Sequence, residues 1–145
     1  MSTTARARIR AGMVVAATAF KSANPTLSRA VFEVRPTRFS GDLPLWFVEI
    51  LTEDVLHTAG TQQRVFEPSF VCVFRPVENS EQPDLTDAIV DGFTEFLKDY
   101  AHIASNLVWS RLRTTEESFE LPTGEVYPAL RFTLLDATEM TGRTT

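Results

Sequence analysis

The stretch "DLTDAIVDGFTEFLKDYAHIA", residues 84–104, constrains the fold of this 145-residue chain most strongly. On a helix of 3.6 residues per turn, its apolar residues form one arc and its acidic residues lie opposite. The apolar arc consists of Leu85, Ile89, Phe93, Phe96, Leu97, Tyr100 and Ile103. Because such an arc must be covered by another layer, the sequence predicts a packed amphipathic helix over 84–104, with Asp84 as its N-cap.

The segments on both sides of this helix show the alternation of β-strands. Strands are predicted over residues 29–39, 45–60, 61–76, 106–121 and 125–140, with turns at 40–44 and 122–124. Residues 45–60 are apolar first and more polar later, which indicates either one long strand or a strand that continues into an extended arm. Pro68 lies inside the strand at 61–76 and predicts an edge position or a bulge there, because proline has no N–H for the ladder.

Alternation also assigns faces to two of these strands. In the strand 61–76 we expect Phe70, Cys72 and Phe74 on one face and Val71 and Val73 on the other.

The closing strand 125–140 has the same pattern. We expect Leu130, Phe132 and Leu134 to face inward, with Arg131 and Thr133 outward.

An N-terminal helix is predicted over residues 3–21. Ile9, Met13, Ala16 and Phe20 recur at helical spacing, and "SANP" breaks the helix after Lys21. The basic start and small apolar residues also resemble a signal peptide, but the apolar part is rich in alanine and therefore weak. The spacing favours an amphipathic helix that packs on the rest of the domain.

Together these elements give the order α-β-β-β-α-β-β. This order predicts a single α+β domain over residues 1–145, with a largely antiparallel sheet of about five strands and a polar C-terminal tail at about 141–145. Apolar residues make up 43% of the chain, which is enough for one buried core, and no apolar run reaches the length of a membrane span. One cysteine excludes an internal disulfide.

Charge is distributed unevenly along the chain. Residues 1–38 hold seven basic and one acidic side chain, whereas residues 39–145 hold seven basic and eighteen acidic ones. Such a split favours contacts between unlike surfaces of neighbouring copies. With a pI near 5.0, the chain is not expected to bind nucleic acid in general, because its acidic body repels phosphates.

The helix 84–104 carries carboxylates at a spacing of four: Asp87, Asp91, Glu95 and Asp99. They share a helix face but span about 18 Å, so one Mg²⁺ or Ca²⁺ could bind two of them at most and would need further oxygen ligands. The pattern therefore indicates a solvated face or an electrostatic docking face, and no metal or cofactor is expected.

Catalytic motifs are also missing from the sequence. His57 has no assignable serine or cysteine partner, Cys72 lies inside an aromatic strand, and the phosphate-binding, zinc-binding and redox motifs do not occur. The sequence therefore predicts a protein that is not an enzyme.

Over nearly its full length the chain resembles the tail terminator proteins of long-tailed (siphovirus-type) bacteriophages. The resemblance lies in the N-terminal helix "RARIRAGMVVAATAF", the strands around "PLWFVEILTED" and "FEPSFVCVFRP", the helix 84–104, and the closing strands that end in "YPALRFTLLDATEM". No residue-level functional motif accompanies it.

The resemblance implies a structural virion protein, assembled in the bacterial cytoplasm and located at the neck of the tail. Its members form a hexameric ring that caps the head-proximal end of the tail tube, ends tube polymerisation and joins the head connector or stopper protein. DNA would pass through the ring as cargo, and no membrane contact is implied. Another neck or tail-tube component, or a cavity-bearing small-molecule-binding domain, remains an alternative.

For such a ring the charge split suggests which residues meet neighbouring copies or layers. The candidate interface residues are Arg6, Arg8, Arg10, Asp87, Asp91, Glu95 and Asp99.

Overall fold

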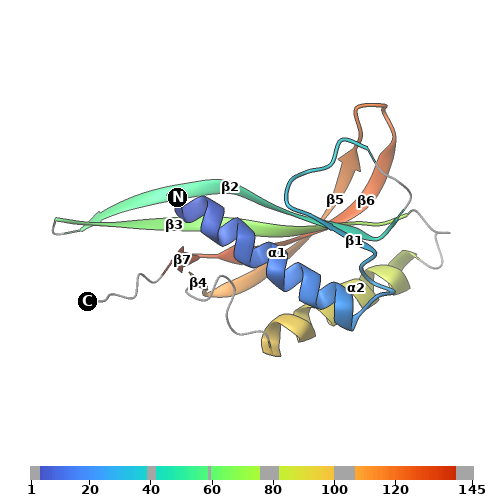
Figure 1. Ribbon diagram of the computed structural model, residues 1–145, viewed down its shortest axis with the longest axis horizontal. Coiled ribbons are helices and arrows are strands. Elements are labelled where there is room, and N and C mark those ends of the chain that lie inside the picture. Colours follow the sequence, from blue (N-terminus) through green and yellow to red (C-terminus); the bar gives the residue numbers. More distant parts are fainter. Residues whose placement is uncertain (1–3, 39–41, 59, 76–81, 100–106, 140–145) are drawn as a thin grey trace.

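The computed structural model describes residues 4–38, 42–58, 60–75, 82–99 and 107–139, and it confirms the α+β fold with two helices (Figure 1). In chain order the elements are α1 (Ala5–Ala23), β1 (Ala30–Phe32), β2 (Leu45–Thr58), β3 (Thr61–Val73), α2 (Gln82–Asp99), β4 (Leu107–Val108), β5 (Arg111–Glu120), β6 (Val126–Leu135) and β7 (Thr138–Glu139).

Five strands form one sheet in the order β1-β2-β3-β6-β5, and β4 pairs with β7 in a separate two-stranded ladder. All pairs of the larger sheet are antiparallel except β1 with β2, which run parallel. The prediction of a largely antiparallel sheet of about five strands is therefore confirmed.

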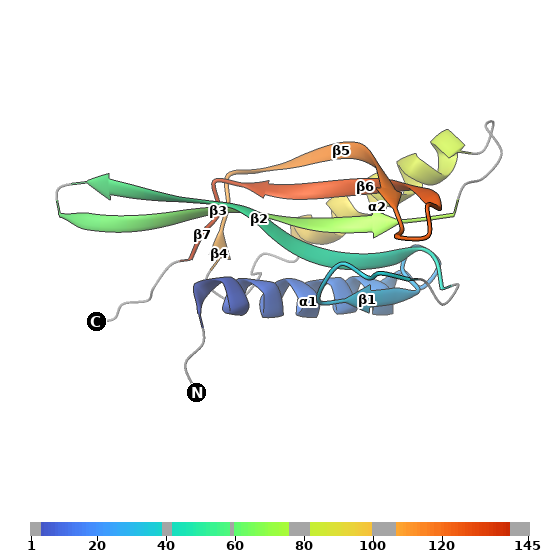
Figure 2. The same cartoon turned by 90° about the horizontal axis from the view of Figure 1, so that it is seen from above.

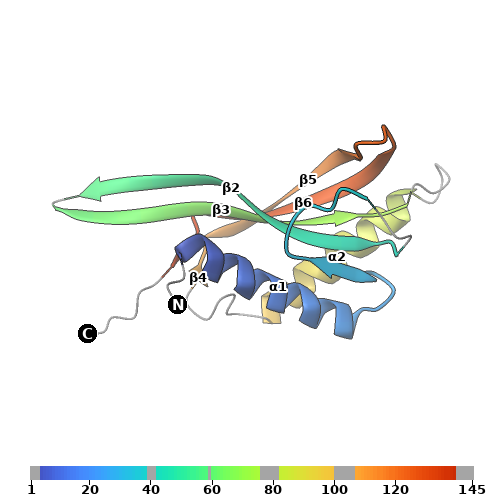
Figure 3. The same ribbon diagram turned by 45° about the horizontal axis from the view of Figure 1, so that its top comes forward.

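Both helices pack on one face of this sheet and enclose the main core (Figure 3). Phe93 of α2 lies at the centre of that core, with ring centroids 5.1 Å from Phe20, 4.5 Å from Trp46, 5.0 Å from Phe70 and 4.8 Å from Phe132. These rings come from α1, β2, β3 and β6, so one aromatic cluster holds both helices to three adjacent strands.

The N-terminal helix forms as expected, shifted by two residues from the predicted range 3–21. Thr4 is its N-cap and accepts a hydrogen bond from the N–H of Ala7, and the C-cap is Asn24. The four residues that the spacing placed inward, Ile9, Met13, Ala16 and Phe20, are all completely buried.

The second helix begins at Gln82, two residues before the predicted start. Asp84 therefore lies inside the first turn and the N-cap prediction is wrong, although a carboxylate there still interacts favourably with the helix dipole. Ile89, Phe93 and Leu97 are buried and Leu85 and Phe96 half-buried, as the apolar arc predicted. Residues 100–104, with Tyr100 and Ile103, lie outside the described residues.

Several strands are shorter than predicted. The strand expected over 29–39 is only Ala30–Phe32, and the chain then bends through a segment that contains Pro36, which has no N–H for a ladder. The strand expected over 125–140 divides into β6 and β7 at Asp136, whose φ of 55° is the left-handed conformation that ends a strand.

The strand expected over 106–121 divides into β4 and β5 next to Asp136. Ser110, between β4 and β5, donates its N–H to the carbonyl of Leu135 at 2.9 Å and its hydroxyl to Asp136 at 2.8 Å. Both predicted strands therefore turn together away from the main sheet. The predicted tail at 141–145 lies outside the described residues.

The opposite face of the sheet carries a smaller apolar cluster: Leu45, Phe47, Val71, Val73, Phe119, Leu121 and Ala129. The predicted alternation in β3 is confirmed, since Phe70, Cys72 and Phe74 belong to the helix-side core while Val71 and Val73 belong to this second cluster. No helix in the described ranges is long and apolar enough to cross a membrane.

Candidate functional site

The far halves of β2 and β3 leave the sheet and project as a two-stranded arm (Figures 1 and 2). We define the arm as residues 53–58 and 61–65. β1 pairs with β2 only as far as Phe47, and the β6 ladder on β3 covers only Ser69–Val73, so among the residues that the structure describes the arm strands pair with each other alone. The two predicted alternatives for residues 45–60 coincide, because β2 is one long strand, Leu45–Thr58, and its far half forms the arm.

A break in register marks the root of the arm. Ile50 pairs with Pro68 and Glu53 pairs with Phe66, so two residues of β2 lie opposite Glu67 alone. Pro68 therefore sits at a bulge, one of its two predicted positions, and not at a sheet edge, because β3 is central.

The register on the other side of β3 changes at the same point. Ser69 pairs with Thr133, whereas Phe66 bridges to Ala137, which leaves one extra residue on the β6 side. Bulges bend and twist a strand pair, so the arm leaves the sheet where both of its neighbours are irregular.

Three large apolar side chains are exposed at the arm and its root. Leu51 is 66% exposed, Val55 44% and Leu56 49%. Since Val55 and Leu56 are consecutive in a strand, they face opposite sides of the arm. A two-stranded hairpin is marginally stable in water, and apolar side chains on both of its faces are typical of a contact surface.

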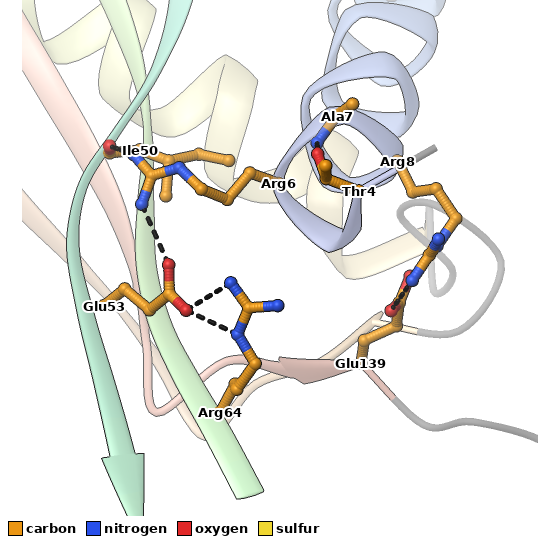
Figure 4. A network of polar contacts seen from close by, with 8 residues as sticks. All are labelled: Thr4, Arg6, Ala7, Arg8, Ile50, Glu53, Arg64 and Glu139. Carbon is orange, nitrogen blue, oxygen red and sulfur yellow. Dashed lines mark hydrogen bonds and ion pairs between the residues drawn. The ribbon is translucent and has the colours of Figure 1, made fainter. Parts of the chain in front are cut away.

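A polar network fixes the root of the arm to α1 (Figure 4). Arg6 donates from Nη1 to Oε1 of Glu53 at 3.1 Å and from Nη2 to the carbonyl oxygen of Ile50 at 2.5 Å. Arg64, across the arm, donates to the other oxygen of Glu53. The hydrogen bond from Arg64, together with that from Arg6, lowers the pKa of Glu53.

The next arginine of α1 ties the helix to the end of the described chain. Arg8 forms a two-point ion pair with Glu139 of β7, at 2.8 Å and 2.7 Å, and this hydrogen bonding lowers the pKa of Glu139 (Figure 4). A planar guanidinium that meets both carboxylate oxygens fixes direction as well as distance. The first turn of α1 is thus held between the arm and β7.

A second charged network crosses the helix-free face of the sheet. Glu49 of β2 accepts from Arg35 at 2.8 Å and from Arg131 of β6 at 3.0 Å, and Arg131 also donates to Glu117 of β5 at 2.8 Å. The Arg35 guanidinium lies over Phe119, 5.0 Å from the ring centroid. Arg131 faces away from the helices as predicted, and its side chain is nevertheless only 11% exposed.

The predicted interface arginines have different surroundings. Arg6 and Arg8 pair with acidic side chains of the same chain. Arg10, one turn further along, forms no ion pair or hydrogen bond with any described residue.

The predicted acidic residues lie on the outer side of α2. Asp87, Asp91 and Glu95 are exposed, and Glu95 lies 3.5 Å from Lys98. The side chain of Asp99 lies outside the described part of the structure. Asp87, Asp91 and Glu95 form no ion pair with Arg6, Arg8 or Arg10 in the described part of the chain, where Arg6 pairs with Glu53 and Arg8 with Glu139.

The remaining chemical candidates are apart from one another. His57 is exposed on the arm, and Cys72 is buried in the core, where desolvation raises the pKa of its thiol. Within the described ranges no three His, Cys, Asp or Glu side chains come together as a metal site would require. Three of the surface grooves among the described residues have volumes of about 240, 220 and 190 Å³, and His57 lines none of these three.

Comparison with models of known protein families finds no family that matches this chain, and comparison with curated proteins finds no match either.

Proposed function

We propose that this chain is a structural virion protein that forms a ring at the head-proximal end of a bacteriophage tail tube. In this role it ends tube polymerisation and joins the tube to the head connector or stopper protein, while DNA passes through as cargo. It acts through contacts between surfaces and not as an enzyme, and it needs no cofactor.

The observation that carries this proposal is the projecting arm. Leu51 at the root and Val55 and Leu56 on the arm expose apolar surface, and among the described residues the arm strands form a ladder only with each other. A neighbouring copy would cover this surface and stabilise the hairpin. Because arm and body are different surfaces, repeated contacts of this kind are heterologous and close into a ring when their rotation allows it.

The sequence resemblance and the charge split give independent support. A ring subunit must present different surfaces to its two neighbours and to the layers above and below it. The exposed acids Asp87, Asp91 and Glu95 on α2 offer one such surface, and charges of this type orient assembly more than they add affinity.

Mass photometry and negative-stain electron microscopy of the purified full chain test the proposal. We expect ring particles with six times the 16.2 kDa mass of one chain. Removal of the gene from its phage should give tails of abnormal length that fail to join heads.

Monomers at every concentration, together with normal tails after gene removal, would contradict the proposal. Open filaments in place of rings would assign the chain to the tail tube.

A further inference from the structure

A shallow groove of about 220 Å³ lies beside β2, where β1 stops. Val34, Arg10 of α1 and the β2 residues from Val48 to Leu51 line it. Val34 is 63% exposed and Leu51 66%, so the groove has two open apolar sides and a cation at its rim.

One main-chain acceptor of β2 along this groove is already occupied, which hinders the addition of another strand. Phe66 exchanges hydrogen bonds with Ala137, so its main-chain groups point away from β2, and those of Pro68, two residues further along, point the same way. In an antiparallel pair, the main-chain N–H and C=O groups of two opposite residues either both point toward the partner strand or both point away from it. Ile50 lies opposite Pro68, so its carbonyl points to the open side of β2. Arg6 occupies that carbonyl, and the groove is therefore suited to side chains.

Two opposite charges close to these surfaces have no partner in the described part of the chain. The Arg10 side chain at the groove and the exposed Asp54 side chain on the arm form no ion pair or hydrogen bond with any described residue. Asp54 and Leu56 are two apart in a strand, so they point to the same face of the arm. That face therefore offers an acid and an apolar side chain, as the groove offers a cation and apolar sides.

We propose that the arm of one copy docks in this groove of the next copy, with Leu56 between Val34 and Leu51 and Asp54 paired with Arg10. The inference rests on the proposed ring function and names the contact that builds the ring. The apolar contact supplies affinity, and the ion pair selects the orientation of the arm.

Charge exchange tests this contact in the full chain. Arg10→Glu alone and Asp54→Arg alone should each raise the concentration at which half of the chains assemble by about three- to tenfold, because each places like charges together. The double variant Arg10→Glu/Asp54→Arg should return to the wild-type value. Lys21→Glu and Glu116→Arg, at exposed positions away from the groove and arm, are matched controls and should leave assembly unchanged.

Cross-linking gives a readout that does not depend on affinity. Copies with Arg10→Cys mixed with copies carrying Asp54→Cys should form mixed disulfides on oxidation, whereas neither variant alone should do so. Cys72 is buried and does not interfere.

The outcomes separate this inference from the ring function. Single variants that both assemble at the wild-type concentration, or absence of both rescue and mixed disulfides, would overturn the docking contact and leave the ring function standing. A wild-type chain that never assembles would overturn both.

Discussion

Glu49 shows how a charged residue is accommodated inside a sheet face. Its side chain is 12% exposed, yet it lies between Arg35 and Arg131 and accepts a hydrogen bond from each. Burial raises the pKa of Glu49, but these hydrogen bonds and charges outweigh burial and hold the pKa below its ordinary value of 4.5. The carboxylate is therefore stabilised in its charged form.

Acid should weaken the fold through this residue. A pKa that is lower in the folded than in the unfolded state contributes stability that is complete above the unfolded pKa and is lost as the pH falls through the folded one. We expect the free energy of unfolding, measured by urea denaturation, to decline below about pH 5. Glu49→Gln should cost about 1–3 kcal/mol at pH 7, and this difference should shrink in acid.

Glu116→Gln, an exposed position on β5, is the matched control and should follow the wild-type curve. A Glu49→Gln curve that stays parallel to wild type down to pH 3 would contradict this account.

Single residues also show where sequence reasoning ends. The burial of Ile9, Met13 and Phe20 follows from helical spacing alone and could be predicted. The pairing of Arg6 with Glu53 joins residues 47 positions apart, and that of Arg8 with Glu139 joins residues 131 apart. Local periodicity contains no information on such pairs, so the partners that Arg6 and Arg8 have in their own chain could not be predicted from the sequence.

At the scale of elements, periodicity identifies the helices and strands but not where strands stop. The predicted strand over 106–121 contains no proline or glycine, and its division depends on hydrogen bonds from Ser110 to Leu135 and Asp136 of a later strand. Pro68 is the clearest local signal of an irregular strand. In the structure it lies beside a bulge, at the point where the β6 ladder on β3 ends. The break between β4 and β5 is thus set by a neighbouring strand and not by its own residues.

The arm depends on α1 for its direction, and Arg6→Met tests this dependence. The change removes the donors to Glu53 and to the Ile50 carbonyl while it keeps much of the apolar stem. We expect a small loss in the free energy of unfolding, because the ion pair is solvent-screened and only the hydrogen bonds at the root are removed. Amide hydrogen exchange should become faster at the root of the arm, because the hairpin loses its connection to the helix.

Arg10→Met is the matched control, since Arg10 has no described partner within the chain. In the monomer it should change neither stability nor exchange. Equal effects of the two variants would show that the root network does not hold the arm.

At the scale of the whole molecule, the chain divides into a body that folds around Phe93 and an arm that adds little to that core. The arm is therefore expected to be dispensable for folding and required for assembly. The proposed function depends on this division, because the arm of each copy would contact the body of a neighbouring copy.

Shortening the arm tests the division directly. Asp54 and Val65 are cross-strand partners, so residues 55–64 can be replaced by Asn-Gly, which favours a two-residue hairpin turn. The shortened chain should keep the circular dichroism spectrum of the wild type. Its melting temperature should lie within a few degrees of the wild-type value, because only surface contacts are removed. It should remain monomeric where the full chain forms rings.

A variant with Gln62 and Gln63 changed to serine retains the length of the arm and is the control. Rings formed by the shortened chain would show that the arm is not the assembling element.

The two register changes beside Pro68 also determine how the length of the hairpin could vary between related chains. Phe66, at the first pair beyond them, still belongs to the core, but the pairs from Asp54 and Val65 outward lie outside it, so the number of those pairs can change without repacking a buried ring. Insertion of two residues in each strand would lengthen the hairpin by about 7 Å and preserve which side chains face which way, whereas one residue in each would invert them. The spacing between successive subunits is therefore expected to change in even steps.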